Sequence, residues 1–161
     1  IAKATNTDIS FSNGWRYGAP IAKGKITEND LYNIAPMNPP ISTVELTGKE
    51  IKEMLEENLE RTFCSNPLKQ MGGYVKRVLG LQINMRIENP KEHRIQEIYY
   101  KGSHLELDKT YKVSFVTMQG VAKKYGKNRK KHNQKAVEAM KAFLKENPEF
   151  TPGTIKVFRL V

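Results

Sequence analysis

The stretch Ser12-Asn13-Gly14-Trp15-Arg16-Tyr17-Gly18 follows a short alternating run, Asp8-Ile9-Ser10-Phe11, which predicts a strand that ends in a turn. Asn-Gly is a strong turn signal because both residues tolerate positive φ. The chain's one tryptophan, Trp15, and Arg16 follow at once. Arginine can hold two oxygens of an anion, and glycine lets a ligand approach the backbone closely. The stretch therefore has a composition typical of the edge of a binding site. A hairpin corner with a core-filling Trp15 and a surface Arg16 would have the same composition.

The composition is that of an ordinary globular domain. With 161 residues, 39% hydrophobic and 27% charged, the chain is expected to form one domain with a substantial core. No apolar run approaches the ~20 residues that span a bilayer, and the first residues lack the apolar segment of a signal peptide. Because the chain starts without Met, we expect residues 1–161 to be a single domain cut from a longer two-domain protein.

The formal net charge of +10 favours anionic partners at long range. Much of this excess lies between Val121 and Lys135, a segment without a single acid. We expect a loop with solvated charges here, and a polyanion-binding segment is the alternative. The basic residues are Lys123, Lys124, Lys127, Arg129, Lys130, Lys131 and Lys135.

Motifs for complete catalysis are absent from the sequence. One cysteine, Cys64, excludes an internal disulfide and a multi-cysteine metal site. His93, His104 and His132 lack the spacing of metal ligands. There is no nucleophile elbow, Walker loop or dinucleotide fingerprint. We therefore expect a binding or partner domain that is not catalytic alone.

The hydrophobic pattern predicts an α+β fold with a mixed β-sheet and flanking helices. Capping boxes at 27–30 and 47–50 predict two helix starts, and a second long helix is expected over 133–146. Strands are expected over 8–12, 41–46, 74–79, 81–87, 94–100, 110–117 and 154–161. The acidic residues of the helix after 47 are expected to form a solvated face rather than a metal or acid–base site. They are Glu53, Glu56, Glu57 and Glu60.

Several stretches, taken in order, resemble the C-terminal domain of the bacterial 5′-nucleotidase family. They are Asp8 to Gly14 running into Arg16, Gly24 to Thr27, Asp30 to Tyr32, Pro36, Val44 to Lys52, Gly72-Gly73, Val78 to Leu81, and Asp108 to Val113. The resemblance covers roughly residues 5–118. Trp15 after the glycine and the segment Phe63 to Leu81 are most similar to the branch that includes the thiosulfohydrolase of bacterial sulfur oxidation.

This resemblance implies a substrate-binding domain of a metal-dependent phosphoesterase. The divalent metal pair, Mn or Zn, would lie on a missing N-terminal metallophosphoesterase domain, with no cofactor in this one. The expected ligand is an anionic small molecule such as a nucleotide. Nucleic acid is not the expected partner, and family members imply an exported or cell-surface parent.

The resemblance also implies the substrate-binding residues. By position Arg16 contacts the phosphate end of the substrate, and Asn13, Gly14 and Trp15 shape the turn that presents it. Asn38 and Gly73 complete the set together with two positions that carry base-stacking aromatics in nucleotidases. Those positions hold Met37 and Met118 here, and methionine cannot form the same stack. Each of these methionines, and Trp15, could instead fill the core.

Two alternatives to a nucleotidase domain therefore stay open. One is the equivalent domain of a thiosulfohydrolase-like sulfur-compound hydrolase, which Trp15 and the segment Phe63 to Leu81 favour, while the two methionines weaken the case for a nucleoside pocket. The other is a basic module that binds nucleic acid or an anionic polymer, which the charge between 121 and 135 favours.

Overall fold

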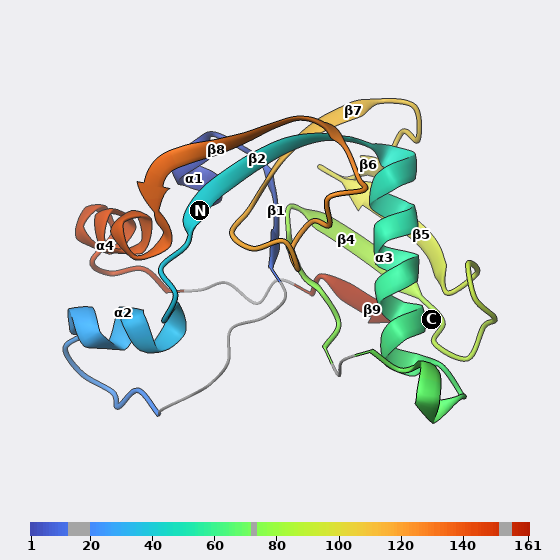
Figure 1. Cartoon of the computed structure of the whole chain (residues 1–161), viewed down its shortest axis with the longest axis horizontal. Helices are drawn as coiled ribbons and strands as arrows, with labels where there is room; N and C mark the ends of the chain where they lie inside the picture. The colour runs from blue at the N-terminus through green and yellow to red at the C-terminus, as the bar shows by residue number, and fades with distance from the viewer. Residues whose placement is uncertain (13–19, 72–73, 152–155) are drawn as a thin grey trace.

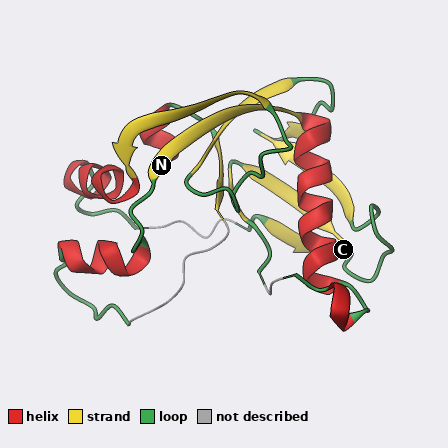
Figure 2. Ribbon diagram, in the orientation of Figure 1, coloured by secondary structure: helices red, strands yellow, loops and turns green. Residues whose placement is uncertain are grey.

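The computed structural model describes residues 1–12, 20–71, 74–151 and 156–161. These residues form two β-sheets with helices around them (Figures 1 and 2). The five-stranded sheet has the order β3-β1-β7-β2-β8 and the four-stranded sheet the order β6-β5-β4-β9. The strands are β1 (Ile9–Ser12), β2 (Pro40–Thr47), β3 (Arg77–Leu79), β4 (Leu81–Met85), β5 (Ile95–Tyr100), β6 (Ser103–His104), β7 (Thr110–Phe115), β8 (Lys127–Lys135) and β9 (Phe158–Leu160).

Both sheets are mixed. β1 pairs in parallel with β7, and β4 in parallel with β9, while the other pairs are antiparallel. The helices are α1 (Ala2–Thr5), α2 (Glu28–Ile34), α3 (Gly48–Phe63) and α4 (Ala136–Glu146), with a short 3-10 turn, η1 (Pro67–Lys69). The expected α+β class with a mixed sheet is thus confirmed, with the strands divided between two sheets.

The long helix α3 is built as its sequence predicts. Thr47 accepts a hydrogen bond from the backbone of Glu50, whose side chain accepts one from the backbone of Thr47 in return. One face of α3 is buried against strands of both sheets, and in Figure 1 the helix lies in front of β4 and β5. The core residues on this face are Ile51, Met54, Leu55 and Leu59.

A smaller cluster lies at the other end of the molecule, where α2 and α4 are side by side (Figure 1). Leu31 of α2 and Val137 of α4 pack there with Val116, which directly follows β7. An exposed ion pair between Lys141 and Glu28, at 2.7 Å, joins the two helices at the surface.

The expectation of a loop through the basic block is wrong. Residues 127–135 form β8, which pairs antiparallel with β2, and α4 begins at Ala136 rather than at 133. β8 lies at the edge of its sheet, where one side of a strand faces solvent. Lysines are common on such edges because their charge opposes pairing with another chain. A strand here therefore needs no alternation of apolar residues.

Arg129 anchors β8 to the preceding loop. Its guanidinium donates hydrogen bonds to the carbonyls of Val121, Ala122 and Tyr125 at 2.9–3.1 Å, and lies 4.8 Å from the ring centre of Phe115. One of the seven basic residues of the block is thus a structural cation rather than a solvated charge.

Other boundaries differ by a few residues. The strand expected over 74–79 begins only at Arg77, and the one expected over 81–87 ends at Met85. The last strand covers Phe158–Leu160, and Ile155 lies outside the described residues. Strand ends depend on the partner strand's length, which local pattern does not contain.

Candidate functional site

The register of the five-stranded sheet brings four chain segments to one edge. β1 and β7 are parallel, with Phe11 opposite Phe115, so their carboxyl ends lie together. β3 is antiparallel to β1, with Arg77 opposite Ser12, and β2 is antiparallel to β7, with Ser42 opposite Phe115. The carboxyl ends of β1 and β7 and the amino ends of β2 and β3 therefore lie at the same edge (Figure 1). We call it the β1–β7 edge.

All the predicted substrate-binding residues lie within four residues of these strand ends in the sequence. Met37 and Asn38 precede β2, and Met118 follows β7. The other five lie outside the described residues, four of them directly after β1 and one before β3: Asn13, Gly14, Trp15, Arg16 and Gly73. The topology thus brings together the strand ends next to which the predicted set lies in the sequence, and substrate contact by each residue stays a prediction.

The two methionines are both at the surface. Met37 is 86% exposed, so the alternative that it fills the core is wrong. Met118 is 42% exposed and lines a cavity. Both side chains are therefore accessible to a ligand.

Asn38 is held by hydrogen bonds to two helices. Its backbone is left-handed, with φ of 37°, which asparagine tolerates better than most residues. Its Oδ1 accepts a hydrogen bond from the N–H of Val137 at 2.9 Å, and its Nδ2 lies 3.5 Å from the hydroxyl of Tyr32. Asn38 therefore ties the segment before β2 to the first turn of α4.

A cavity of about 380 Å³ opens between α3 and the segment after β7. Its walls are polar and apolar in about equal measure, and Lys76 lines it although this lysine is only 6% exposed. We call it the Lys76 cavity. Its lining residues are Met54, Glu57, Asn58, Arg61, Met71, Tyr74, Lys76, Met118, Gln119, Ala122 and Tyr125.

Two hydrogen bonds hold Lys76 in place. Its backbone N–H donates to Oδ1 of Asn58 on α3 at 2.7 Å, and its Nζ donates to the carbonyl of Gln119 at 2.6 Å. Sequence reasoning did not single out Lys76. The available signal was alternation, because Lys76 is two residues before the buried Val78, the spacing at which residues of a strand share a face, although β3 itself begins at Arg77.

Burial lowers the pKa of Lys76 from 10.5 to about 8. The negative charge of Glu57 works against this shift, and the positive charge of Arg61 adds to it. An amine of this kind is charged at neutral pH but at a cost in free energy.

This cost makes stability depend on pH. Below pH 8 Lys76 is charged in both the folded and unfolded states, so the folded state bears the full cost of burying the cation. Between pH 8 and 10.5 the folded state loses the proton first, so the free energy of unfolding should rise, by on the order of 3 kcal/mol.

Lys76→Met removes the titrating group. The stability of this variant relative to the wild type, from urea unfolding, should therefore fall steadily from pH 7 to 10.5. A difference independent of pH would contradict the assignment.

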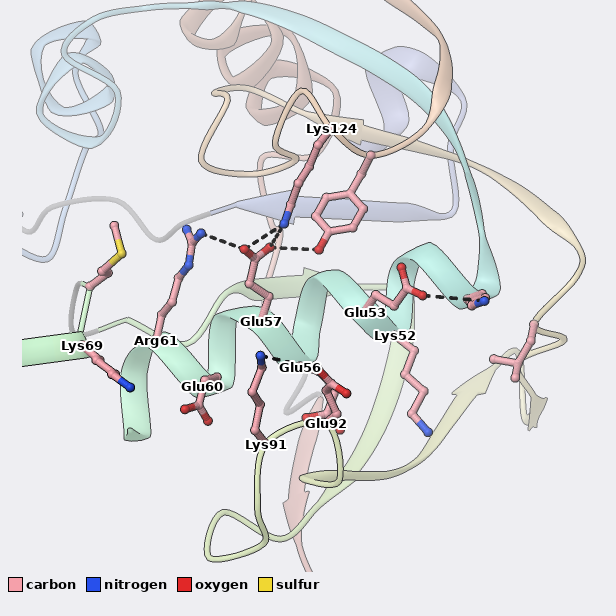
Figure 3. Close-up of a pocket in the computed structure, with 14 residues that line it drawn as sticks. Lys52, Glu53, Glu56, Glu57, Glu60, Arg61, Lys69, Lys91, Glu92 and Lys124 are labelled. Atoms are coloured by element: carbon pink, nitrogen blue, oxygen red, sulfur yellow. Dashed lines mark hydrogen bonds and ion pairs between the residues drawn. The ribbon is translucent and has the colours of Figure 1, made fainter. Parts of the chain in front are cut away.

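A second hollow, of about 770 Å³, runs along the outer face of α3 (Figure 3). Glu57 lies at its centre and pairs with Arg61 at 2.7 Å and Lys124 at 2.9 Å, while the Tyr125 hydroxyl donates to it at 2.9 Å. Burial alone would raise the pKa of Glu57, but these hydrogen bonds and the charges of Arg61 and Lys124 outweigh it and lower the pKa. Glu57 is therefore an ionised cross-link between α3 and the loop before β8, and not a proton donor.

The expectation of a solvated acidic face on α3 is wrong for Glu56 and incomplete for its neighbours. Glu56 is buried, and its carboxyl accepts hydrogen bonds from the backbone N–H groups of Arg94 and Ile95, at 3.3 and 2.6 Å. Glu60 pairs with the buried guanidinium of Arg94, which lowers the pKa of Glu60. Glu53 is the exposed one, 4.0 Å from Lys49. Most of the acidic cluster thus fastens α3 to its surroundings.

Replacing Glu56 by alanine should destabilise the domain by about 3 kcal/mol, because two buried N–H groups lose their acceptor. Glu56→Gln should cost less, about 1 kcal/mol, since an amide keeps one acceptor oxygen. Glu53→Ala is the matched control on the exposed side and should change little. Urea unfolding measures all three, and equal losses for Glu56→Ala and Glu53→Ala would contradict the role of Glu56.

Within the described ranges, no group of three or more His, Cys, Asp or Glu side chains is placed to hold a metal ion. In the same part of the chain, no helix has both the length and the apolar character needed to cross a membrane. Cys64 is buried with a free thiol.

The family model described as "5′-nucleotidase, C-terminal domain" matches residues 1–124, which include all four segments of the β1–β7 edge. The chain belongs to this family. The family and the fold class expected from the sequence are thus confirmed. The match ends just before β8 and α4.

Two Bacillus subtilis (strain 168) proteins are similar to this 5′-nucleotidase C-terminal domain in sequence. The trifunctional nucleotide phosphoesterase protein YfkN is 29% identical over 117 residues, which make up 70% of this chain and 8% of that protein. The endonuclease YhcR is 33% identical over 60 residues, 37% of this chain and 5% of that protein. The domain thus spans less than a tenth of the length of either relative.

Solved structures share the fold. The sulfate thiohydrolase SoxB of Thermus thermophilus, in complex with glycerol, matches 99% of this chain and 30% of its own, with a TM-score of 0.85 and 24% identity. A 5′-nucleotidase precursor, also from Thermus thermophilus, matches 99% of this chain and 32% of its own, with a TM-score of 0.73 and 22% identity. The 5′-nucleotidase C-terminal domain therefore occurs as about one third of these larger chains.

Proposed function

We propose that this chain is the substrate-binding domain of a metal-dependent phosphoesterase and that the reaction requires a separate metallophosphoesterase domain. One observation supports this most directly: the β1–β7 edge brings together four strand ends, and every predicted substrate-binding residue lies within four residues of one of them in the sequence. Binding residues are often carried by loops next to the strand ends of a rigid sheet.

The proposed substrate carries an anionic group that Arg16 grips with its guanidinium. A guanidinium binds two oxygens of a phosphate or sulfate at once, and the net charge of +10 draws anions toward the domain. The relative YfkN is named a nucleotide phosphoesterase, so a nucleotide or a similar phosphate ester is the first candidate. Exposed Met37 and Met118 would contact the rest of the substrate.

The equivalent domain of a sulfur-compound hydrolase is the second candidate. Trp15 after the Asn-Gly turn and the segment Phe63 to Leu81 favour it, and the two methionines in place of stacking aromatics weaken the case for a nucleoside. The TM-score of 0.85 with SoxB is a likeness of fold, and adds no substrate by itself. Turnover of a thiosulfonate-bearing substrate, with none of nucleotides, would favour this candidate over the first.

The parent protein is proposed to act outside the cytoplasm. The name of the Thermus thermophilus 5′-nucleotidase includes the word precursor, which supports export in the family.

A reconstitution assay tests the proposed function. The 161-residue chain, incubated with Mn²⁺ or Zn²⁺ and either AMP or an aryl phosphate, should give no turnover. A protein that joins this domain to a metallophosphoesterase domain should hydrolyse at least one of the two esters, with a KM that rises when the domain is deleted. Robust turnover by the chain alone, or an unchanged KM after the deletion, would overturn the proposal.

A further inference from the structure

Lys76 is a buried cation without a buried counter-ion. Two cationic side chains, Lys76 and Arg94, are buried among the residues of the described ranges. Arg94 forms an ion pair with Glu60, whereas Lys76 has the backbone carbonyl of Gln119 as its acceptor and no carboxylate of the described residues within ion-pair distance. A buried charge without a partner is costly, and a charged side chain kept in such a position beside a cavity is a candidate for ligand binding.

The surroundings of Lys76 have the form of a small-molecule site. The Lys76 cavity, of about 380 Å³, is within the usual size range for ligand sites, and its lining combines apolar and polar groups in about equal measure. Met54 and Met118 supply adaptable apolar surface, and Tyr74 supplies an aromatic ring that is 63% exposed. The acidic residue in the lining, Glu57, is already held by Arg61, Lys124 and Tyr125.

We propose that the Lys76 cavity binds a small organic anion, whose carboxylate, sulfonate or phosphate group pairs with Nζ of Lys76 and whose apolar part packs against Met54, Met118 and Tyr74. This binding needs no second domain, because the cavity is lined entirely by this chain. Met118 belongs both to this cavity and to the predicted substrate-binding set, but the anion contact proposed here is Lys76 and not Arg16. Lys76→Met in the 161-residue chain and Arg16→Ala in a two-domain protein therefore test the two proposals separately.

The pairing has a defined dependence on pH. An anion beside Nζ stabilises the charged amine, so binding should raise the pKa of Lys76 from about 8, and affinity should fall as pH rises above 8. The charged or titratable groups that face the cavity are Glu57 and Arg61 from α3, Tyr74 from the segment before β3, and Tyr125 from the loop before β8.

Titration of the 161-residue chain with benzenesulfonate, followed by calorimetry at pH 7, tests the proposal. Benzyl alcohol is the uncharged probe of similar size. We expect benzenesulfonate to bind at least 10-fold more tightly than benzyl alcohol, and Lys76→Met to weaken its binding at least 10-fold. Lys130→Met, which removes an exposed lysine of β8, is the matched control and should leave the affinity unchanged. Equal affinity in the wild type and Lys76→Met, or no binding of benzenesulfonate up to about 10 mM, would overturn the proposal.

A second measurement keeps the test decisive if Lys76→Met does not fold. In the wild type, labelled at the lysine ε-carbon, an NMR titration follows the pKa of Lys76 directly. We expect saturation with benzenesulfonate to raise this pKa. An unchanged pKa in the presence of the anion would overturn the proposal.

Discussion

Replacing Gly80 by alanine should destabilise the domain by about 3 kcal/mol or more. Gly80 joins β3 to β4, at the point where the chain passes from the five-stranded to the four-stranded sheet. Its φ of 85° is strained for any residue with a side chain. A Cβ at this position would lie 2.1 Å from the carbonyl oxygen of Asp8 and 2.9 Å from its carbon, and because both are backbone atoms, no side-chain rotation can relieve the clash.

Gly102→Ala is the matched control for this effect. Gly102 has almost the same φ, 83°, but an added Cβ there would meet no atom within 4 Å. The stability that Gly102→Ala loses should therefore come from backbone strain alone, about 1 kcal/mol. Urea unfolding of both variants separates the two contributions. Equal losses would show that close packing of β3–β4 against Asp8 contributes nothing.

Local signals in the sequence predicted the helices well. Both expected capping boxes are formed, at Thr27–Asp30 and at Thr47–Glu50, since a cap requires only residues three positions apart. The apolar face of α3 is buried as its spacing predicts. The order of the motifs also predicted the family that the comparisons confirm.

The strand β8 could not be predicted from its composition. Its nine residues are polar or basic and show no apolar alternation. It is a strand because β2 offers its open side to Lys127–Lys135, and such a pairing depends on tertiary structure. The same composition in a free segment would favour the loop that we expected.

The burial of single charges was also beyond the sequence. Glu56 and Glu57 are adjacent on α3, yet one is buried beneath β5 and the other pairs with Lys124 at the surface. Lys76 is buried because α3 and the segment after β7 close over it. Helical spacing predicts which face of the helix each residue is on. It does not predict which distant segment covers that face.

The second large effect concerns Arg16, in a protein that carries both this domain and a metallophosphoesterase domain. Arg16→Ala should lower kcat/KM about 100-fold, because the substrate loses a two-point, charge-assisted contact to its anionic group. Arg16→Lys keeps the charge but not the two-point geometry and should lose less. Arg159, exposed on β9 in the other sheet, provides the matched control, and Arg159→Ala should leave kcat/KM unchanged.

The value of kcat/KM for Arg16→Ala in that two-domain protein, beside the wild type and Arg159→Ala, tests the central claim most directly. A substrate-binding role for this domain predicts a loss of about 100-fold for Arg16→Ala alone. A kcat/KM equal to that of the wild type would contradict it, and would leave the Asn-Gly turn as a corner of the fold.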